Sequence, residues 1–117
     1  TYPYYSGFAS ERGIDQGEGF TLNLPLASAT TLDSYLAALD IALERIAAHA
    51  PRYLLLSLGL DIYHLDPLGD FTITLDDFGR IGTHIAALGL PTLVIQEGGY
   101  DTLEGGTALT NFLSHIA

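Results

Sequence analysis

An acidic loop that follows an apolar run in the middle of the chain could hold a metal ion. The stretch LSLGLDIYHLDPLGDF, residues 56–71, contains in order Asp61, His64, Asp66 and Asp70. An aspartate at the end of a strand can bind a borderline cation through oxygen at about 2 Å. The spacing Asp-x-x-His-x-Asp allows two interpretations. In the first, all three side chains form a local metal site. In the second, Asp66 organises the turn at Pro67, which is the role that we favour for it, and Asp61 is either a metal ligand by itself or a turn former. We expect Asp70 to be solvated.

A tyrosine follows a glycine pair in a second stretch of similar design. The segment PTLVIQEGGYD, residues 91–101, places Gly98, Gly99 and Tyr100 directly after an apolar run. A tyrosine hydroxyl could donate a hydrogen bond to the oxyanion that forms when a carbonyl is attacked. Glycines let the backbone turn tightly and let a ligand come close. The alternative is an aromatic ring that only packs on its loop.

Composition and charge limit the partners. The chain contains no Cys, which excludes disulfides and thiolate metal ligands. Fourteen acids against four basic residues give a formal charge of −10, which opposes nucleic acid and anionic membranes but suits a cationic partner. No run approaches the roughly 20 apolar residues of a membrane span. We expect a cytoplasmic protein that binds neither nucleic acid nor membrane, and homo-oligomer formation stays open.

The elements that must position these side chains alternate between strand and helix. Apolar periodicity predicts strands over 20–26, 52–58 and 91–96, and helices over 31–49, from Thr74 to about residue 88, and from about Thr107 to the end. The two later strands are continuous apolar runs, which is typical of strands buried on both faces. This order predicts an α/β fold with a parallel sheet and flanking helices. Because ligands bind beyond the carboxyl ends of such strands, we expect Asp61 and Tyr100 at the same edge.

Taken together, the two stretches resemble one family. The pattern G-x-D-x-x-x-x-D-P-L at residues 59–68, followed by E-G-G-Y at 97–100, is similar to the C-terminal part of zinc-dependent histone deacetylases and acetylpolyamine amidohydrolases. The opening YPYYSGFASERGIDQGEGFTLNLPL resembles the class II-like branch. The resemblance covers essentially the whole chain. It implies part of a three-layer arginase/deacetylase-like fold and hydrolysis of an acetylated cationic small molecule or an acetyl-lysine peptide, with one zinc ion.

The resemblance also implies roles for individual residues. They are Asp61 as a zinc ligand, Tyr100 as the oxyanion donor, Tyr5, Leu68, Gly98 and Gly99 along the substrate tunnel, and Tyr4 and His64 at its rim. The family's Asp-x-His pair, which supplies two further zinc ligands, and its catalytic His-His pair do not occur here. We therefore expect residues 1–117 to be the C-terminal fragment of a single deacetylase-like domain, inactive in isolation.

Two alternatives compete with this interpretation. Arginases and agmatinases carry an Asp-x-Asp-x-x-Asp-Pro motif that bridges two manganese ions, but Tyr63 stands where the second Asp would be. The remaining alternative is a non-catalytic α/β fragment.

Overall fold

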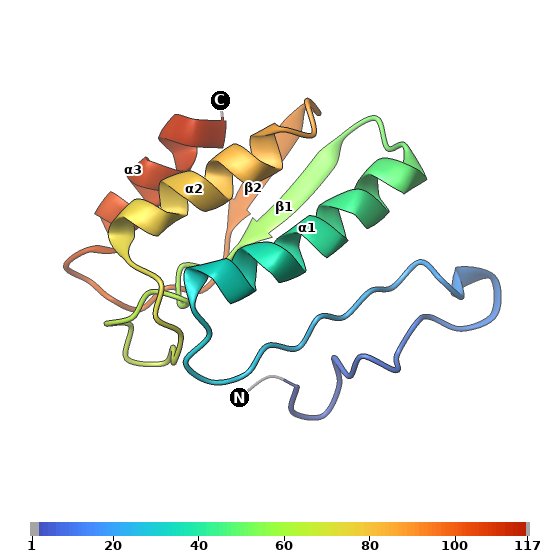
Figure 1. Ribbon diagram of the computed structural model, residues 1–117, viewed down its shortest axis with the longest axis horizontal. Helices are drawn as coiled ribbons and strands as arrows, with labels where there is room; N and C mark the ends of the chain where they lie inside the picture. The colour runs from blue at the N-terminus through green and yellow to red at the C-terminus, as the bar shows by residue number, and fades with distance from the viewer. Residues whose placement is uncertain (1–2, 117) are drawn as a thin grey trace.

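The computed structural model describes residues 3–116. Its elements are the 3-10 turn η1 (Asp15–Gly17), α1 (Leu32–His49), β1 (Leu54–Leu58), α2 (Leu75–Ala86), β2 (Thr92–Gln96) and α3 (Gly105–Ile116). The two strands pair in parallel, with Leu54 opposite Thr92 and Leu58 opposite Gln96, and α2 is the crossover between them. Figure 1 shows α1 and α2 side by side against the sheet, with α3 next to α2. The predicted α/β fold with a parallel sheet and flanking helices is confirmed.

The helix boundaries follow local signals in the sequence. The hydroxyl of Thr31 accepts a hydrogen bond from the backbone N–H of Ser34, and α1 ends at a left-handed Ala50 before Pro51. Thr74 precedes α2, and its backbone N–H and hydroxyl both donate to the Asp77 carboxylate, at 2.8 and 2.7 Å. The third helix begins two residues before the predicted start, and Ala117 lies outside the described residues.

The predicted strand over 20–26 is wrong. These residues are extended, but none of them belongs to a strand, and residues 3–31 form a strap with a single 3-10 turn that runs beside α1 (Figure 1). Isolated hydrogen bonds hold the strap against the rest of the chain. The guanidinium of Arg45 donates to the Gly19 carbonyl, and the Ala29 N–H donates to Asp70 O at 2.8 Å. Alternating apolar residues form a strand only when a partner strand completes the hydrogen bonds, and the described part of the chain offers residues 20–26 none.

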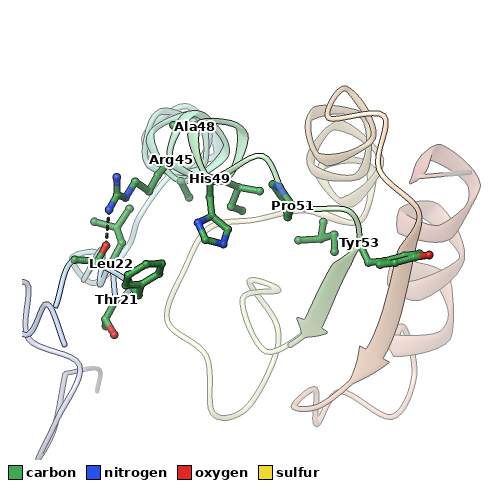
Figure 2. Close-up of a pocket in the computed structure, with 12 residues that line it drawn as sticks. Thr21, Leu22, Arg45, Ala48, His49, Pro51 and Tyr53 are labelled. Atoms are coloured by element: carbon green, nitrogen blue, oxygen red, sulfur yellow. Dashed lines mark hydrogen bonds between the residues drawn. The ribbon is translucent and has the colours of Figure 1, made fainter. Parts of the chain in front are cut away.

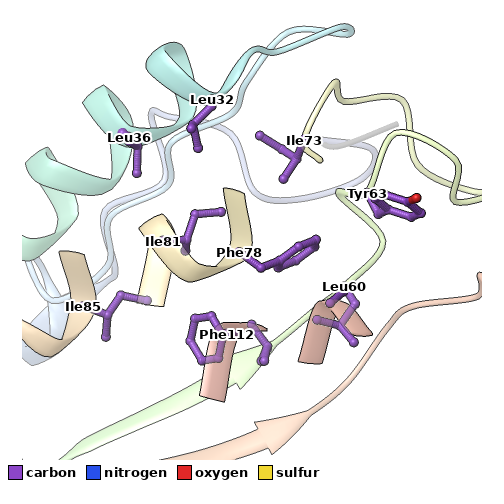
Figure 3. Close-up of a cluster of buried hydrophobic side chains, with 11 residues drawn as sticks. Leu32, Leu36, Leu60, Tyr63, Ile73, Phe78, Ile81, Ile85 and Phe112 are labelled. Atoms are coloured by element: carbon purple, nitrogen blue, oxygen red, sulfur yellow. The ribbon is translucent and has the colours of Figure 1, made fainter. Parts of the chain in front are cut away.

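The core lies between the helices and one face of the sheet (Figure 3). Its buried side chains are Leu32, Leu36, Leu58, Leu60, Tyr63, Ile73, Phe78, Ile81, Ile85, Ala108 and Phe112. Leu54, Leu56 and Val94 pack against this cluster from the sheet. The opposite face is exposed, with 68% of Leu55 and 59% of Leu93 accessible. The prediction that both strands are buried on two faces is therefore wrong for the described residues, which cover one face only.

Glycines on α2 let α3 approach closely. A Cβ on Gly82 would lie 2.7 Å from the backbone oxygen of Phe112, and one on Gly79 would lie 2.9 Å from the His115 ring. The close approach packs Phe78 and Phe112 in the centre of the core, both fully buried. None of the helices in the described part of the chain combines the length and apolarity that a bilayer crossing requires.

Candidate active site

Beyond the last paired residues of the two strands, the loops that follow β1 and β2 remain hydrogen-bonded to each other. The Glu97 N–H donates to Leu58 O, and the Leu60 N–H donates to Gly98 O, both at 2.8 Å. The loop that contains Asp61 and the loop that contains Tyr100 therefore leave the sheet at the same edge. This geometry agrees with the position expected from the sequence.

Asp61 is packed against glycines of both loops. A Cβ on Gly59 would lie 2.7 Å from Asp61 Oδ1, and one on Gly98 would lie 2.5 Å from Asp61 Oδ2. The residue is half-buried, and no described side chain or backbone N–H donates a hydrogen bond to its carboxylate. Its oxygens are therefore positioned by packing and are not committed to another group within residues 3–116.

Asp66 behaves differently, because backbone amides surround its carboxylate. Only 5% of the residue is exposed. Its Oδ1 accepts from the Leu68 N–H at 2.9 Å, which is the turn expected before Pro67. Its Oδ2 accepts from the N–H groups of Tyr100 and Asp101, at 2.6 and 3.0 Å. These last two bonds were not predicted, since the donors lie 34 and 35 residues further along the chain.

The hydrogen bonds keep Asp66 ionised. Burial alone would raise the pKa of this carboxyl, but the backbone N–H groups of Tyr100, Leu68, Asp101 and Gly69 together lower the pKa below its ordinary value. A carboxylate that already accepts from several amides has little capacity left for a metal ion. The structure thus gives Asp66 a structural role, as the favoured interpretation of the sequence held.

The alternative prediction, a local metal site formed by the Asp-x-x-His-x-Asp side chains, is wrong for the described residues. His64 is exposed, and its Nδ1 lies 3.2 Å from the carbonyl oxygen of Ile73. Nowhere in residues 3–116 do three His, Cys, Asp or Glu side chains come together in a metal-binding arrangement. Within residues 3–116 a metal at this edge would therefore meet fewer than three such side chains, and Asp61 is one whose carboxylate accepts no described hydrogen bond.

Tyr100 is held by its backbone rather than by its ring. About half of the residue is exposed, whereas its N–H is bound to Asp66. The neighbouring Asp101 Oδ1 accepts from the N–H groups of Leu103 and Glu104, at 2.9 and 2.6 Å, and so shapes the turn into α3. The ring carries no described hydrogen bond, and its role as an oxyanion donor stays a prediction.

Leu68, Tyr4 and Tyr5, predicted to lie along the tunnel or at its rim, are exposed, whereas Gly98 and Gly99 are half-buried. Leu68 is 72% exposed on the loop that contains Asp61. Tyr4 and Tyr5 form an edge-to-face pair with ring centroids 4.4 Å apart at the start of the strap. No hydrogen bond or ring contact among the described residues joins these two tyrosines to Asp61 or Tyr100. Their tunnel and rim roles therefore stay predictions.

Two of the hollows beside the strap lie at opposite ends of β1. One, of about 550 Å³, is lined by residues that include Phe20, Arg45, His49 and Tyr53 (Figure 2). It lies at the start of β1, the opposite end of the strand from Asp61. The other, of about 520 Å³, is bordered by Asp61 itself, together with apolar side chains that include Leu24, Ile62, Leu68 and Phe71. The second hollow is thus the one that adjoins the candidate metal ligand.

The buried Tyr63 disagrees with the ureohydrolase alternative. This residue stands where that motif needs a second bridging carboxylate, and only 4% of it is exposed. Its ring is part of the core (Figure 3). The position therefore serves packing rather than metal binding.

Comparisons with known proteins agree with the geometry. The histone deacetylase domain model matches residues 1–116. The acetylpolyamine amidohydrolase 1 of Pseudomonas aeruginosa is 48% identical over 96% of this chain and 32% of its own length. The acetylpolyamine amidohydrolase of Mycoplana ramosa is 38% identical over 99% of this chain and 34% of its own length. The crystal structure of an acetylpolyamine aminohydrolase from Burkholderia pseudomallei superposes with a TM-score of 0.94 at 38% identity, covering 98% of this chain and 34% of that one.

The chain spans about a third of the length of the curated relatives it matches. The match nevertheless runs through every element described above and through both strand-end loops. The chain belongs to the histone deacetylase domain family.

Proposed function

We propose that this chain is the C-terminal third of a single-domain, zinc-dependent amidohydrolase that removes acetyl groups from cationic substrates. The observation that carries the proposal is the shared sheet edge, where the free carboxylate of Asp61 and the anchored backbone of Tyr100 occupy adjoining loops. A metal ligand and a phenol on adjoining loops are the two groups that amide hydrolysis needs from this part of a site.

Asp61 suits one zinc ligand. Asp61 is half-buried, its carboxylate accepts no hydrogen bond from the described residues, and it borders a hollow of about 520 Å³. A catalytic zinc ion uses three protein ligands, so the other two would come from polypeptide beyond this sequence. By itself the 117-residue chain should therefore show no turnover. Bound zinc would supply the Lewis acidity that polarises the acetyl carbonyl and activates a water molecule.

The residues of this chain would divide the remaining work. The Tyr100 hydroxyl would donate to the carbonyl oxygen as negative charge develops there. Gly98 and Gly99 would leave room for the acyl group, while Leu68 and Tyr5 would line the tunnel, with His64 and Tyr4 at the rim. The general base would come from histidines elsewhere in the domain, since no histidine within residues 3–116 belongs to a group of three potential metal ligands.

The substrate class follows from the net charge and from the relatives' names. A formal charge of −10 favours approach by a cation. The relatives are named for acetylpolyamines, and others for histones. We infer an acetylated polyamine or acetyl-lysine peptide as substrate and a cytoplasmic enzyme, with no nucleic acid or membrane partner.

A chimera tests the proposal. The matching third of the Pseudomonas aeruginosa acetylpolyamine amidohydrolase 1 would be replaced by residues 1–117 of this chain. Acetate release from an N-acetylated diamine and from an acetyl-lysine peptide would be measured, along with zinc content. The chimera should bind one zinc ion and hydrolyse at least one of the two substrates.

Matched variants separate function from folding. Asp61→Ala should abolish turnover and zinc binding, whereas Asp76→Asn, which removes an exposed carboxylate on α2, should change neither. A folded, zinc-loaded chimera that hydrolyses neither substrate would overturn the proposed function.

A further inference from the structure

We propose that Asp66 is a positioning residue that holds Tyr100 in register with Asp61, a role that rests on the proposed function of Tyr100. Asp66 belongs to the loop after β1, whereas Tyr100 belongs to the loop after β2. One side chain therefore joins the two loops that carry the candidate catalytic groups.

Two hydrogen bonds to a single buried carboxylate connect the loops, and a third holds the loop of Asp66 itself. Oδ2 accepts from the N–H groups of Tyr100 at 2.6 Å and Asp101 at 3.0 Å, while Oδ1 accepts from Leu68 at 2.9 Å. With 5% of Asp66 exposed, water competes little for these bonds. Hydrogen bonds to an ionised acceptor are about twice as strong as neutral ones. The backbone of Tyr100 is therefore tied to the first loop and not only to the end of β2.

The loop after β2 needs such a tie. Gly99, directly before Tyr100, has a φ of +134° and the conformational freedom of glycine. The Tyr100 side chain is half exposed, so packing alone does not immobilise it. Because Asp66 binds the first two N–H groups after Gly99, it restricts rotation at the point where the Tyr100 backbone could swing.

Asp66 itself lies in a turn that packs close to Asp61. The loop folds back so tightly that a Cβ on Gly69 would overlap the carbonyl oxygen of Asp61, and the Gly69 N–H donates to the backbone oxygen of Asp66 at 3.3 Å. Asp66 therefore sits in a compact turn that packs against the backbone of Asp61. Through this turn, Asp66 sets the position of the Tyr100 backbone relative to Asp61.

A purely structural role is the competing explanation. Asp101 shapes the turn into α3, so Asp66 could act only by steadying Asp101 and the start of that helix. This alternative predicts lower stability and less folded protein, with unchanged kcat for the molecules that remain folded. The positioning role predicts a lower kcat that depends on the Tyr100 hydroxyl.

A double-mutant cycle in the chimera distinguishes the two. In Asp66→Asn the amide NH2 cannot accept, and the oxygen that remains is neutral and accepts more weakly than the carboxylate, so the hydrogen bond to the Tyr100 N–H is lost or weakened. We expect kcat to fall by about ten- to a hundredfold with KM nearly unchanged and full zinc content, because a misplaced catalytic group slows the chemical step. In a Tyr100→Phe background, the same substitution should lower kcat by less than about twofold, because the hydroxyl it positions is already gone.

Every outcome decides between explanations. If the unsubstituted chimera is inactive, or if Tyr100→Phe is fully active, the proposed function fails and this inference fails with it. If both are as expected but the effects of Asp66→Asn and Tyr100→Phe multiply independently, only the positioning role is overturned.

Should Asp66→Asn not fold, Asp66→Glu, which keeps the charge but moves the carboxylate, enters the same cycle. Asp76→Asn serves as the control for loss of a carboxylate elsewhere.

Discussion

The carboxylate of Asp61 lies directly against Gly98, so that a Cβ at residue 98 would stand 2.5 Å from Asp61 Oδ2. The two residues come from different loops, one after β1 and one after β2. Position 98 therefore has to be glycine if the carboxylate is to keep its place. The requirement is spatial, since the φ of Gly98 is not in the left-handed region.

Gly98→Ala should displace the Asp61 carboxylate. Real Cβ atoms do not approach other heavy atoms within 3.0 Å, so either the carboxylate rotates or the loop shifts. In the chimera we expect zinc affinity to fall by about tenfold or more, the range seen when ligand orientation is disturbed. Zinc titration monitored by a competing chelator measures this.

Gly106→Ala is the matched control for that substitution. A Cβ at Gly106 meets nothing within 4 Å, and the residue lies in the first turn of α3. Alanine should leave zinc affinity unchanged and stabilise the helix slightly. Equal zinc affinities in the two variants would contradict the packing argument for Gly98.

Asp61→Ala and His64→Ala should have opposite consequences for metal binding. The carboxylate of Asp61 is free at the sheet edge, whereas His64 is exposed and its Nδ1 faces a backbone carbonyl. Elemental analysis of the purified chimeras should show zinc lost from the first variant and retained in the second. Zinc loss from His64→Ala would instead restore a local ligand role for the histidine.

Tyr100→Phe should lower kcat by about 10²–10³ with little change in KM, the usual cost of removing one oxyanion donor. The substitution keeps the half-exposed ring and the N–H that binds Asp66. Steady-state kinetics of the chimera provide the measurement, and urea denaturation checks stability. If Tyr100→Phe is silent while Tyr100→Ala is unstable, Tyr100 serves packing only.

The lowered pKa of Asp66 predicts a pH dependence of stability. An aspartate has a pKa of about 3.9 in the unfolded chain. In the folded chain, burial raises the pKa of Asp66, but backbone hydrogen bonds lower it by more, so that the pKa lies below the ordinary value. The unfolded state therefore binds the proton more readily. The stabilisation is present above the unfolded pKa and is lost as the pH falls through the folded pKa.

Urea denaturation of the 117-residue chain between pH 7 and pH 3 tests this. The free energy of unfolding should decrease on acidification, and Asp66→Asn should both destabilise the chain at pH 7 and reduce the slope. Asp76→Asn, on the exposed face of α2, should retain the slope of the unsubstituted chain. A slope unaltered by Asp66→Asn would contradict the assignment.

The packing of α2 on α3 predicts a large effect at Phe112 and a small one at Phe20. Phe112 is fully buried, whereas Phe20 is 72% exposed. Phe112→Ala should cost about 3–5 kcal/mol of unfolding free energy through lost burial and the cavity left behind. Phe20→Ala should change stability by less than about 1 kcal/mol. Denaturation midpoints of the two variants check the difference.

Much of the fold follows from signals that act over a few residues. The start of α1 at Thr31 and of α2 after Thr74 depends on polar side chains bonding to backbone three residues away. The strands at 54–58 and 92–96 follow from runs of apolar residues long enough to cross a core. Their parallel pairing follows from the intervening helix, since a crossover returns the chain in the same direction.

Residues 20–26 show where local signals fail. Their alternation of apolar and polar side chains is that of a strand, yet a strand also needs the backbone hydrogen bonds of a neighbour. Leu55 and Leu93 are apolar strand residues that are nevertheless exposed, so they too show that local sequence does not determine burial. Apolar side chains predict that a face can be buried, but whether it is buried depends on what else packs there.

The site divides in the same way. Residue types and spacing by themselves determined Asp61 and Tyr100 as candidates, together with the turn between Asp66 and Leu68, because each rests on a side-chain type or on bonds to a near neighbour. The hydrogen bond from Tyr100 to Asp66 and the close packing of Gly98 on Asp61 arise only when the chain folds. Every residue except proline has a backbone N–H, so no residue type marks which distant amide a carboxylate will meet. The folding of two loops onto one sheet edge makes that choice.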